Sequence, residues 1–364
     1  MKQRTVCISP LDWGLGHATR CIPIALSFQE LGYQVYIATD GPQEAILKEA
    51  LPNATILKLK GYRIHYTKQK SFLFFSLLMQ VPKIIARITG EYFWLKKTQK
   101  KYNFNLIVSD NRFGFFHKKV PSVFITHQLN LQTPFRWTSS LYQILLSNWL
   151  QHFKACWIPD TEAILNLSGL LTRPKHKPRI GIWYMGYLSR LYNKESLTNE
   201  PGENEIEFLG IVSGPEPQRT LFENDIWKTG NEAGVPFVMI AGLPNEKLYN
   251  KITPTGALYH HLNGKELAAQ IQRAKYIICR GGYTSLMELI PFQKKLILVP
   301  TPGQTEQMYL AKYWSDQNWA TSFDQSTFNL AEALKQAANK HYAWPRCNEF
   351  STNALAATLN ALPL

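Results

Sequence analysis

The sequence has few cysteines and no long apolar run, and these absences exclude several classes of protein. Its cysteines are Cys7, Cys21, Cys156, Cys279 and Cys347. They form no C-x-x-C pair, and three fall in apolar strand patterns, so we expect reduced, buried side chains. The longest apolar stretch, residues 71–85, is interrupted by Gln80, Pro82 and Lys83; it is shorter than the ~20 residues of a membrane-spanning helix. The apolar run near the start is too short for a signal peptide, so we expect a cytoplasmic protein.

Acidic residues are scarce in the first half of the chain. The 364 residues carry 40 lysines and arginines against 26 aspartates and glutamates, a net charge of +14. Residues 1–190 hold 25 basic and 9 acidic residues, a net +16, whereas residues 191–364 hold 15 and 17, a net −2. A uniformly basic nucleic-acid-binding protein would not be divided in this way. The asymmetry predicts two domains, one of which meets an anionic partner other than nucleic acid.

Short β-rich runs alternate with helical patterns along most of the chain. The expected strands are residues 5–9, 34–38, 106–109, 122–126, 155–158, 207–212, 236–241, 257–260, 276–279 and 295–299. The expected helices are residues 18–31, 43–49, 218–231 and 265–273. This alternation predicts an α/β fold with parallel sheets and right-handed crossovers.

The same pattern predicts the division of the chain. Residues 193–205 are polar and contain Pro201-Gly202, which makes them the best linker. We expect residues 1–192 to form one doubly wound, Rossmann-like domain and residues 206–342 to form a second one. Residues 343–364 are expected to be a helical tail that can return to the first domain. Two such domains in tandem place a ligand cleft between the carboxyl ends of their strands.

The loop after the first strand, DWGLGHATR at residues 12–20, is the first candidate site. Gly14 and Gly16 permit tight turns and close approach of a ligand, and the following helix start exposes N–H groups that suit an anion. The loop lacks the Gly-Lys-Ser/Thr of a Walker loop, and Thr19 stands where G-x-G-x-x-G needs glycine. His17 can accept a proton from a hydroxyl or donate to an anion. Alternatively, the glycines serve only the turn and His17 is a capping or surface residue.

A second glycine turn, RGGYTS at residues 280–285, follows a buried strand. Gly281 and Gly282 precede a helix start that suits a diphosphate, and Thr284 is a good N-cap that could instead bind a phosphate. Glu288 lies one turn into the helix, where a carboxylate can accept both hydroxyls of a ribose. Alternatively, Glu288 is a first-turn glutamate that the helix dipole favours.

The next strand exit carries a pair of amides. Gln304 and Gln307 follow the segment PTPG at residues 300–303 and, three residues apart at a helix start, they share one face. Amide groups both donate and accept hydrogen bonds, which suits sugar hydroxyls. The spacing alone indicates little, but the position of the pair at a strand exit in the predicted cleft favours a role in binding a sugar.

Together these segments resemble the family 28 glycosyltransferases of the GT-B fold, which include the peptidoglycan enzyme that adds N-acetylglucosamine to a lipid-linked acceptor. The most specific part is residues 274–320, AKYIICRGGYTSLMELIPFQKKLILVPTPGQTEQMYLAKYWSDQNWA, which is similar to the donor-binding signature of the family. The segments GLGHATRCIPIAL, from Gly14, and IVSGPEPQRT, from Ile211, resemble its first loop and the first loop of its donor domain. Residues 55–200 match only loosely, and the first loop is poorer in glycine than that of the peptidoglycan enzyme.

The resemblance implies a UDP-sugar in the second domain and an acceptor in the first. The donor-binding residues that it implies are Ser213, Gly214, Arg219, Arg280, Gly281, Gly282, Tyr283, Thr284, Glu288, Gln304 and Gln307. Of these, the residues of the 280–282 turn would border the uracil and phosphates, Ser213 and Gly214 would meet the diphosphate, and the two glutamines would hold the sugar. Gly14 and Gly16 would lie on the acceptor side.

The sequence has no Asp-x-Asp motif to hold a metal against a diphosphate. Helix N-termini and Arg219 would then stabilise the leaving group, so we expect neither a metal nor a cofactor. With one base and no evident nucleophile, an inverting single displacement is expected.

His17, Asp110 and Asp12 are the candidates for the catalytic base. Asp110 ends an expected strand and could orient and polarise His17, or merely cap a helix. Asp12 lies close enough in sequence to act as base itself. His127 ends the neighbouring strand and is placed on the acceptor side, although a lone histidine there is more often structural.

Residues 68–101 interleave aromatic and aliphatic residues with lysine and arginine, and residues 135–154 form a second aromatic-rich helical pattern. Such a mixture is typical of a helix at a membrane interface, where anionic lipids contribute ~1 kcal/mol per basic residue. Alternatively, each is a core helix with a solvated polar face. Pro82 is expected to break or kink the first pattern. We therefore expect a lipid-linked or membrane-proximal acceptor and peripheral contact with the inner face of a membrane.

Two other functions compete with a UDP-sugar-dependent glycosyltransferase. A nucleotide-sugar epimerase can share the two-domain fold, but it would need no sugar acceptor. A basic nucleic-acid-binding protein is disfavoured, because the charge is confined to one half and no binding module is recognisable.

Overall fold

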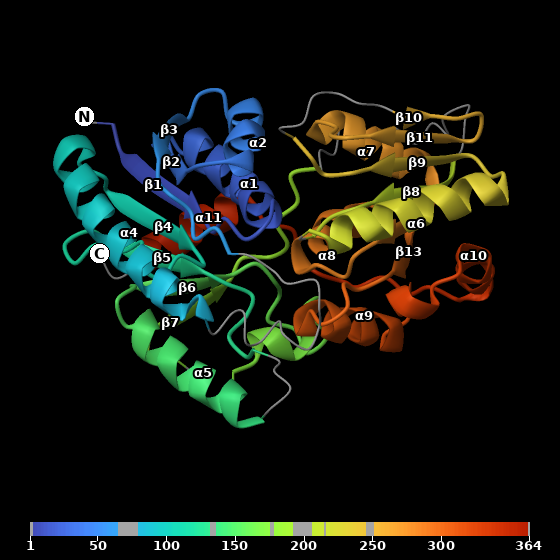
Figure 1. Ribbon diagram of the computed structural model, residues 1–364. Helices are drawn as coiled ribbons and strands as arrows, with labels where there is room; N and C mark the ends of the chain where they lie inside the picture. The colour runs from blue at the N-terminus through green and yellow to red at the C-terminus, as the bar shows by residue number, and fades with distance from the viewer. Residues whose placement is uncertain are drawn as a thin grey trace. The chain divides into compact units, whose positions relative to one another are not determined.

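The computed structural model describes residues 3–64, 79–131, 136–174, 178–191, 206–214, 216–244 and 251–362. They divide into two units (Figure 1). The first unit takes the described residues up to Leu188 and from Cys347 onward, and the second takes those within Ser189–Arg346. The expected linker, residues 193–205, lies outside the described residues, and so do residues 68–78 of the basic, aromatic pattern.

The first unit is built on a parallel seven-stranded sheet of order β3-β2-β1-β4-β5-β6-β7. Its strands are β1 (Thr5–Pro10), β2 (Gln34–Thr39), β3 (Thr55–Lys58), β4 (Leu106–Asp110), β5 (Ser122–Ile125), β6 (Ala155–Ile158) and β7 (Gly181–Tyr184). The chain winds outward from β1 in one direction and then from β4 in the other. Ligands of doubly wound sheets bind where this reversal occurs, at the carboxyl ends of the strands.

Helices cover both faces of this sheet. They are α1 (Gly16–Glu30), α2 (Pro42–Ala50), α4 (Val81–Tyr102), α5 (Arg136–Leu150) and α11 (Thr352–Asn360), with a short 3-10 turn at Gly169–Thr172. α4 and α5 share one hydrophobic cluster, in which Tyr92 of α4 packs with Leu146 and Leu150 of α5 against Phe124 of β5.

The helical pattern of residues 68–101 is interrupted by a turn at Gln80, just before Pro82, and its part before Met79 lies outside the described residues. α4 begins at Val81, so the proline stands in its first turn, where the missing N–H costs no hydrogen bond. The helix ends at Tyr102, and Asn103, with a left-handed φ of 51°, is its C-cap. Lys100 and Lys101 in the last turn complement the helix dipole.

The second unit has a seven-stranded sheet of order β10-β11-β9-β8-β12-β13-β14, parallel except for β10. Its strands are β8 (Ile206–Ile211), β9 (Phe237–Ile240), β10 (Lys251–Ile252), β11 (Gly256–Tyr259), β12 (Ala274–Cys279), β13 (Lys295–Leu298) and β14 (Ala320–Ser322). Its helices are α6 (Gln218–Ala233), α7 (Gly264–Arg273), α8 (Tyr283–Leu289), α9 (Thr305–Asp316) and α10 (Leu330–Asn339), with 3-10 turns at Ile290–Phe292 and Gln325–Thr327.

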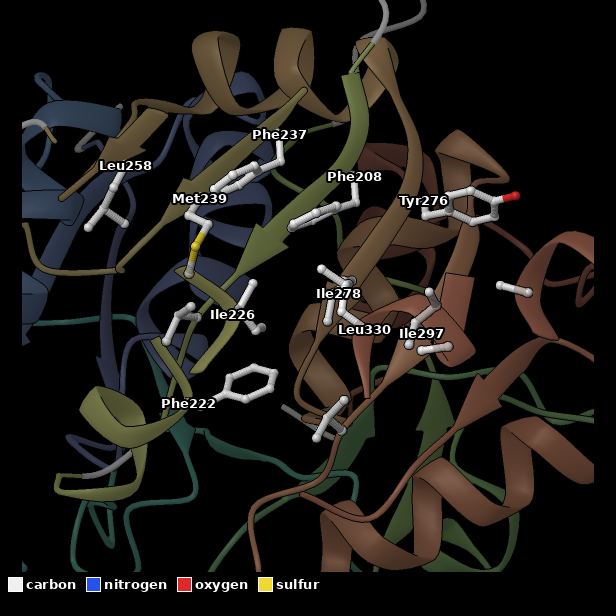
Figure 2. Close-up of a cluster of buried hydrophobic side chains, with 14 of the residues drawn as sticks. Phe208, Phe222, Ile226, Phe237, Met239, Leu258, Tyr276, Ile278, Ile297 and Leu330 are labelled. Atoms are coloured by element: carbon white, nitrogen blue, oxygen red, sulfur yellow. The ribbon is translucent and has the colours of Figure 1, made fainter. Parts of the chain in front are cut away.

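The core of the second unit lies between this sheet and two of its helices (Figure 2). Phe208 of β8 and Phe237 of β9 stack with their ring centroids 4.9 Å apart. Phe222 of α6 and Leu330 of α10 pack on the same cluster. The two doubly wound sheets confirm the predicted α/β, GT-B-type fold.

The end of the chain packs on the first unit. The N–H of Tyr187 donates to the carbonyl of Asn348 at 2.9 Å, and the N–H of Phe350 donates back to the carbonyl of Tyr187 at 3.0 Å. The hydroxyl of Thr352, at the start of α11, donates to that of Ser27 in α1 at 2.9 Å. Residues far apart in the sequence thus form one folded unit.

We expect the substitution Gly186→Ala to separate tail packing from backbone strain. Gly186 has a φ of +82°, and a Cβ there would lie 2.5 Å from the carbonyl oxygen of Asn348. Gly32 has nearly the same φ, +79°, but a Cβ there would meet no atom within 4 Å. In urea unfolding, Gly186→Ala should lower the free energy of unfolding by about 1–3 kcal/mol more than Gly32→Ala does, because overpacking usually costs this much. Equal losses would mean that the tail does not press on Gly186.

Candidate functional site

In the first unit, the loops after three neighbouring strands lie at the same edge of the sheet. β1, β4 and β5 are adjacent and parallel, so their carboxyl ends lie together. The loop with Gly14 and Gly16 follows β1, Asp110 ends β4, and His127 comes shortly after β5. Gly14 has a φ of +83°, a conformation that glycine adopts without strain.

His17, Asp110 and Arg20 form a buried cluster at this edge. Asp110 is fully buried and Arg20 is 1% exposed. Nδ1 of His17 lies 3.0 Å from Oδ2 of Asp110. Nε of Arg20 donates to both carboxylate oxygens at 3.0 Å, and its Nη2 donates to Oδ1. The contact between His17 and Asp110 was expected from the sequence, but the arginine that completes the cluster was not.

The contacts within the cluster determine which of its groups carry a charge. Burial by itself would raise the pKa of Asp110, but the positive charge of Arg20 and the contact with His17 bring it down to about 2. Burial lowers the pKa of His17, and Arg20 lowers it further against the opposing effect of Asp110. At neutral pH the cluster therefore holds a carboxylate, a guanidinium and an uncharged imidazole. Nδ1 of His17 lies within hydrogen-bond distance of both Oδ2 of Asp110, at 3.0 Å, and Nη2 of Arg20, at 2.8 Å. In the tautomer that carries its proton on Nδ1 and donates it to Asp110, Nε2 can accept a proton.

His127 joins the same cluster through Arg20. Its Nδ1 lies 3.0 Å from Nη1 of Arg20, and the residue is 5% exposed. Because a guanidinium only donates, Nδ1 of His127 accepts and Nε2 carries the proton. His127 can therefore offer a hydrogen-bond donor.

Asp12 belongs to a different group of contacts. Its carboxylate accepts hydrogen bonds from the backbone N–H of Tyr62 at 2.8 Å and of Arg63 at 3.0 Å. A Cβ on Gly61 would lie 2.1 Å from Oδ2 of Asp12, so the backbone passes directly over the carboxylate. These contacts commit Asp12 to holding residues 61–63 beside the first loop.

A buried ion pair extends this second group. Nη1 of Arg112 lies 3.2 Å from Oε1 of Glu91 on α4, and Glu91 also accepts from the hydroxyl of Tyr62 at 2.9 Å and the N–H of Gly114 at 3.1 Å. Burial raises the pKa of Glu91 to about 7 against the effect of Arg112. The pair fastens α4 to the loop after β4.

The second unit repeats the arrangement at the carboxyl ends of β8, β12 and β13, which are adjacent and parallel. Ser213 and Gly214 follow β8, and Gly214 has a φ of +115° that favours glycine. A Cβ on Gly281, after β12, would lie 2.9 Å from the carbonyl oxygen of Gln307 in α9. Glycine at position 281 thus allows α9 to approach the turn.

The helix after this turn has its N-cap two residues earlier than expected. α8 starts at Tyr283 with Gly282 as its N-cap and no side-chain cap, so the expectation that Thr284 caps the helix is wrong. Thr284 is half-buried in the first turn. Tyr283 is 2% exposed, which makes it a packing residue of the turn.

Arg280 is directed into the core of the second unit. It is fully buried, and its guanidinium donates to the carbonyls of Val299 at 3.0 Å and Gln218 at 2.8 Å. It lies 3.9 Å from the ring centroid of Phe222, and burial lowers its pKa to about 10. Arg280 therefore fixes the strand exits, and only its backbone can border a ligand.

Glu288 has a partner that the sequence analysis missed. Nε of Arg190 donates to Oε1 of Glu288 at 3.0 Å, with both side chains nearly buried. The hydroxyl of Ser189 donates to the carbonyl of Glu288 at 3.2 Å. An ionised carboxylate can accept several hydrogen bonds at once, so the contact with Arg190 does not by itself prevent Glu288 from accepting hydroxyl groups.

Gln307 holds the loop after β13. Its Oε1 accepts from the N–H of Thr301 at 2.8 Å, which leaves its NH2 group as donor. Gln304 is the N-cap residue of α9 but makes no side-chain cap bond. The hydroxyl of Thr301 is buried without a hydrogen-bond partner among the described residues. A Cβ on Gly214 would lie 3.6 Å from this hydroxyl, so the strand exits of β8 and β13 touch here.

Arg219 lies between two carboxylates of its own segment. Nε donates to Oε1 of Glu216 and Nη1 to Oε2 of Glu223, both at 2.6 Å. Glu216 is 55% exposed, whereas Glu223 is 12% exposed. Glu216 is thus the partner that can leave.

Within the described ranges, no three histidine, cysteine, aspartate or glutamate side chains gather as the ligands of a metal ion would. The cysteines are all unpaired thiols, and four of the five are buried. No helix in the described part of the chain is long and apolar enough to cross a membrane.

Comparison with known proteins agrees with this geometry. Residues 250–357 match the glycosyltransferase family 28 C-terminal domain. Over 340 residues the chain is 20% identical to an uncharacterized glycosyltransferase of Methanosarcina mazei, covering 86% of this chain and 84% of the relative.

Two solved structures extend the likeness to both units. The glycosyltransferase of kitacinnamycin has a TM-score of 0.64 at 12% identity, covering 93% of this chain and 92% of that one. MurG of Acinetobacter baumannii has a TM-score of 0.50 at 14% identity, covering 92% and 90%. At this identity the structures establish the fold, and together with the domain match they confirm the prediction of a family 28-like GT-B glycosyltransferase.

Proposed function

Starting from a family 28-like GT-B glycosyltransferase, we propose that the chain transfers a sugar from a UDP-sugar to an acceptor hydroxyl by an inverting single displacement, without a metal or a cofactor. The observation that carries this proposal is the contact between the partly exposed imidazole of His17 and the buried carboxylate of Asp110 at the carboxyl edge of the first sheet. An uncharged imidazole oriented by a carboxylate is the group that such a displacement needs.

The proposed step transfers one proton at the acceptor, forms one bond to the anomeric carbon and breaks another. Nε2 of His17 accepts the proton of the acceptor hydroxyl, and the oxygen forms a bond to the anomeric carbon. The bond from that carbon to the diphosphate breaks, and the diphosphate leaves with the electron pair. Attack from the face opposite the leaving group inverts the anomeric centre.

Glu288 and Gln307 are proposed to select the donor. Glu288 stands after β12, where its carboxylate would accept the two ribose hydroxyls, while Arg190 fixes its position. The NH2 group of Gln307 is the donor that remains once its oxygen holds Thr301, and it would bind the sugar together with Gln304. The ribose contact favours a ribonucleotide over a deoxyribonucleotide.

The leaving diphosphate would meet backbone N–H groups of Ser213 and Gly214, in the loop between β8 and α6. Arg219 is the nearest candidate for a charge partner in that segment, but it already has two carboxylate partners. The exposed Glu216 would have to release it when the diphosphate arrives, because a guanidinium between two carboxylates carries no net attraction for an anion.

We propose a lipid-linked or membrane-proximal acceptor from the surface of α4 and α5. Ile85 and Phe93 are 57% and 60% exposed. At 3.6 residues per turn they fall, with Lys96 and Lys100, within about 80° around the helix axis. On α5, Leu141, Ile144 and Leu145 expose a second apolar stripe. A helix face with apolar and basic groups side by side suits an anionic bilayer surface, at which a cytoplasmic protein would act.

The function is tested by release of UDP from a panel of UDP-sugars, with and without membrane extract. We expect acceptor-dependent release and a product of inverted anomeric configuration by NMR. His17→Ala should lower turnover by about a hundredfold or more, the usual contribution of a general base, with unchanged affinity for UDP in calorimetry. Interconversion of the donor sugar without any acceptor would instead identify an epimerase.

The ribose assignment predicts a preference for UDP over 2′-deoxy-UDP. Hydrogen bonds to a charged carboxylate contribute roughly 1.5–3 kcal/mol, so the wild-type protein should bind UDP at least about tenfold more tightly. Glu288→Gln should reduce this ratio, because an amide has one acceptor atom instead of two. Glu207→Gln, on the same sheet, is the control and should keep the ratio. A ratio that Glu288→Gln leaves intact would place the ribose elsewhere.

The membrane assignment predicts weaker binding to anionic vesicles when α4 loses its charge. The variant carries glutamine in place of four exposed lysines: Lys96, Lys97, Lys100 and Lys101. At ~1 kcal/mol per residue, its affinity in vesicle sedimentation should fall by more than tenfold. The matched control carries glutamine at four exposed lysines of the second unit: Lys228, Lys265, Lys312 and Lys335. Equal losses in the two variants would show a nonspecific effect of net charge.

A further inference from the structure

The carboxylate of Asp110 needs a compensating positive charge, because it is fully buried at the end of β4. A buried charge that loses its partner is strongly unfavourable. The ionisable groups that face the cluster are Arg20 and Cys21 from α1, Asp110 itself, His127 after β5, and His17. Two of these can serve as the cation: the guanidinium of Arg20 or a protonated His17.

We propose, on the basis of the proposed function, that Arg20 is a positioning residue of the transfer reaction: it supplies the charge that Asp110 requires, so that His17 stays uncharged and can accept the proton of the acceptor. The geometry supports this assignment. Arg20 uses Nε and Nη2 on the carboxylate, while Nη1 is fixed by His127 at 3.0 Å. The guanidinium therefore cannot turn away from Asp110 without breaking both sets of contacts.

Arg20 also stands directly against the imidazole. Its Nη2 lies 2.8 Å from Nδ1 of His17, so a proton added to His17 would place two positive groups in contact. In agreement with this, burial and Arg20 together lower the pKa of His17 even though Asp110 is adjacent. A carboxylate alone would have the opposite effect, since it stabilises an imidazolium.

A purely structural role does not explain an arginine at this position. The other buried side chains of α1, such as Ala18, Ile22 and Phe28, are small or apolar, and Arg20 is the one charged residue among them. Burying a guanidinium carries a desolvation cost that an apolar side chain of similar volume avoids. What the guanidinium adds is its charge and its fork of donors.

The proposal is tested by the pKa of His17, measured by NMR titration of the histidine ring signals in the free, full-length protein. The His17→Gln variant identifies the signal. Arg20→Gln removes the charge and should raise the pKa of His17 by about one unit or more, the usual effect of one neighbouring charge. Arg20→Lys keeps the charge and should leave it close to the wild-type value. An unchanged value in folded Arg20→Gln would overturn the proposal.

If Arg20→Gln does not fold, the same comparison is made with the carboxylate neutralised. The double variants Arg20→Gln/Asp110→Asn and Arg20→Lys/Asp110→Asn differ only in the charge at position 20. The pKa of His17 should be lower in the lysine-containing variant. Equal values in the two double variants would overturn the proposal.

Activity provides a second and separate readout. The acid limb of kcat/KM against pH should move upward by the same amount as the pKa of His17 in Arg20→Gln, and Arg20→Lys should restore it. Loss of rate by an equal factor at every pH would indicate a structural role only. The NMR result does not depend on turnover, so absence of glycosyl transfer in the wild-type protein would refute the proposed function while leaving the charge relation between Arg20 and His17 measurable.

Discussion

The candidate site of the first unit depends on one constraint: the buried negative charge of Asp110 must be balanced by a neighbouring positive charge. Parallel strands end together at one edge, and β4 ends there in a carboxylate with no access to solvent. That carboxylate can persist only beside a cation, and the cation is Arg20 of α1, one turn after His17 on the same helix. The same contact fixes His127. Loop, helix and two strand exits are therefore held in place by one charge and its partners.

In the second unit, the loops at the carboxyl edge of the sheet are held by side chains that bond to the backbone or to one another. Arg280 ties the exits of β12 and β13 together through backbone carbonyls, Gln307 holds Thr301, and Glu288 is fixed by Arg190. These side chains already have partners within the protein, so the proposed donor would meet a preorganised edge. Such preorganisation lowers the cost of ordering side chains on binding.

The sequence carried enough information for the fold and for the edge of each sheet, but not for the partners of the site residues. Strands buried on both faces, such as β1 and β12, were evident as apolar runs. β3 and β7 were not predicted, because these edge strands are short and half-exposed and so lack the continuous apolar run of a buried strand. Arg20 was hidden inside a helical pattern, and nothing local to Arg280 shows that its side chain turns into the core. These facts depend on contacts across some 20 to 90 residues, which no local pattern contains.

The excess of positive charge in the first half of the chain now divides into two kinds. Arg20 and Arg112 are buried and matched by Asp110 and Glu91, so they add nothing to the surface field. The lysines at the end of α4 are exposed. Their charge is therefore available to an external anion, and it lies on the helix that also exposes Ile85 and Phe93. A soluble anionic partner would explain the lysines alone, whereas an anionic lipid surface explains the lysines and the apolar side chains together.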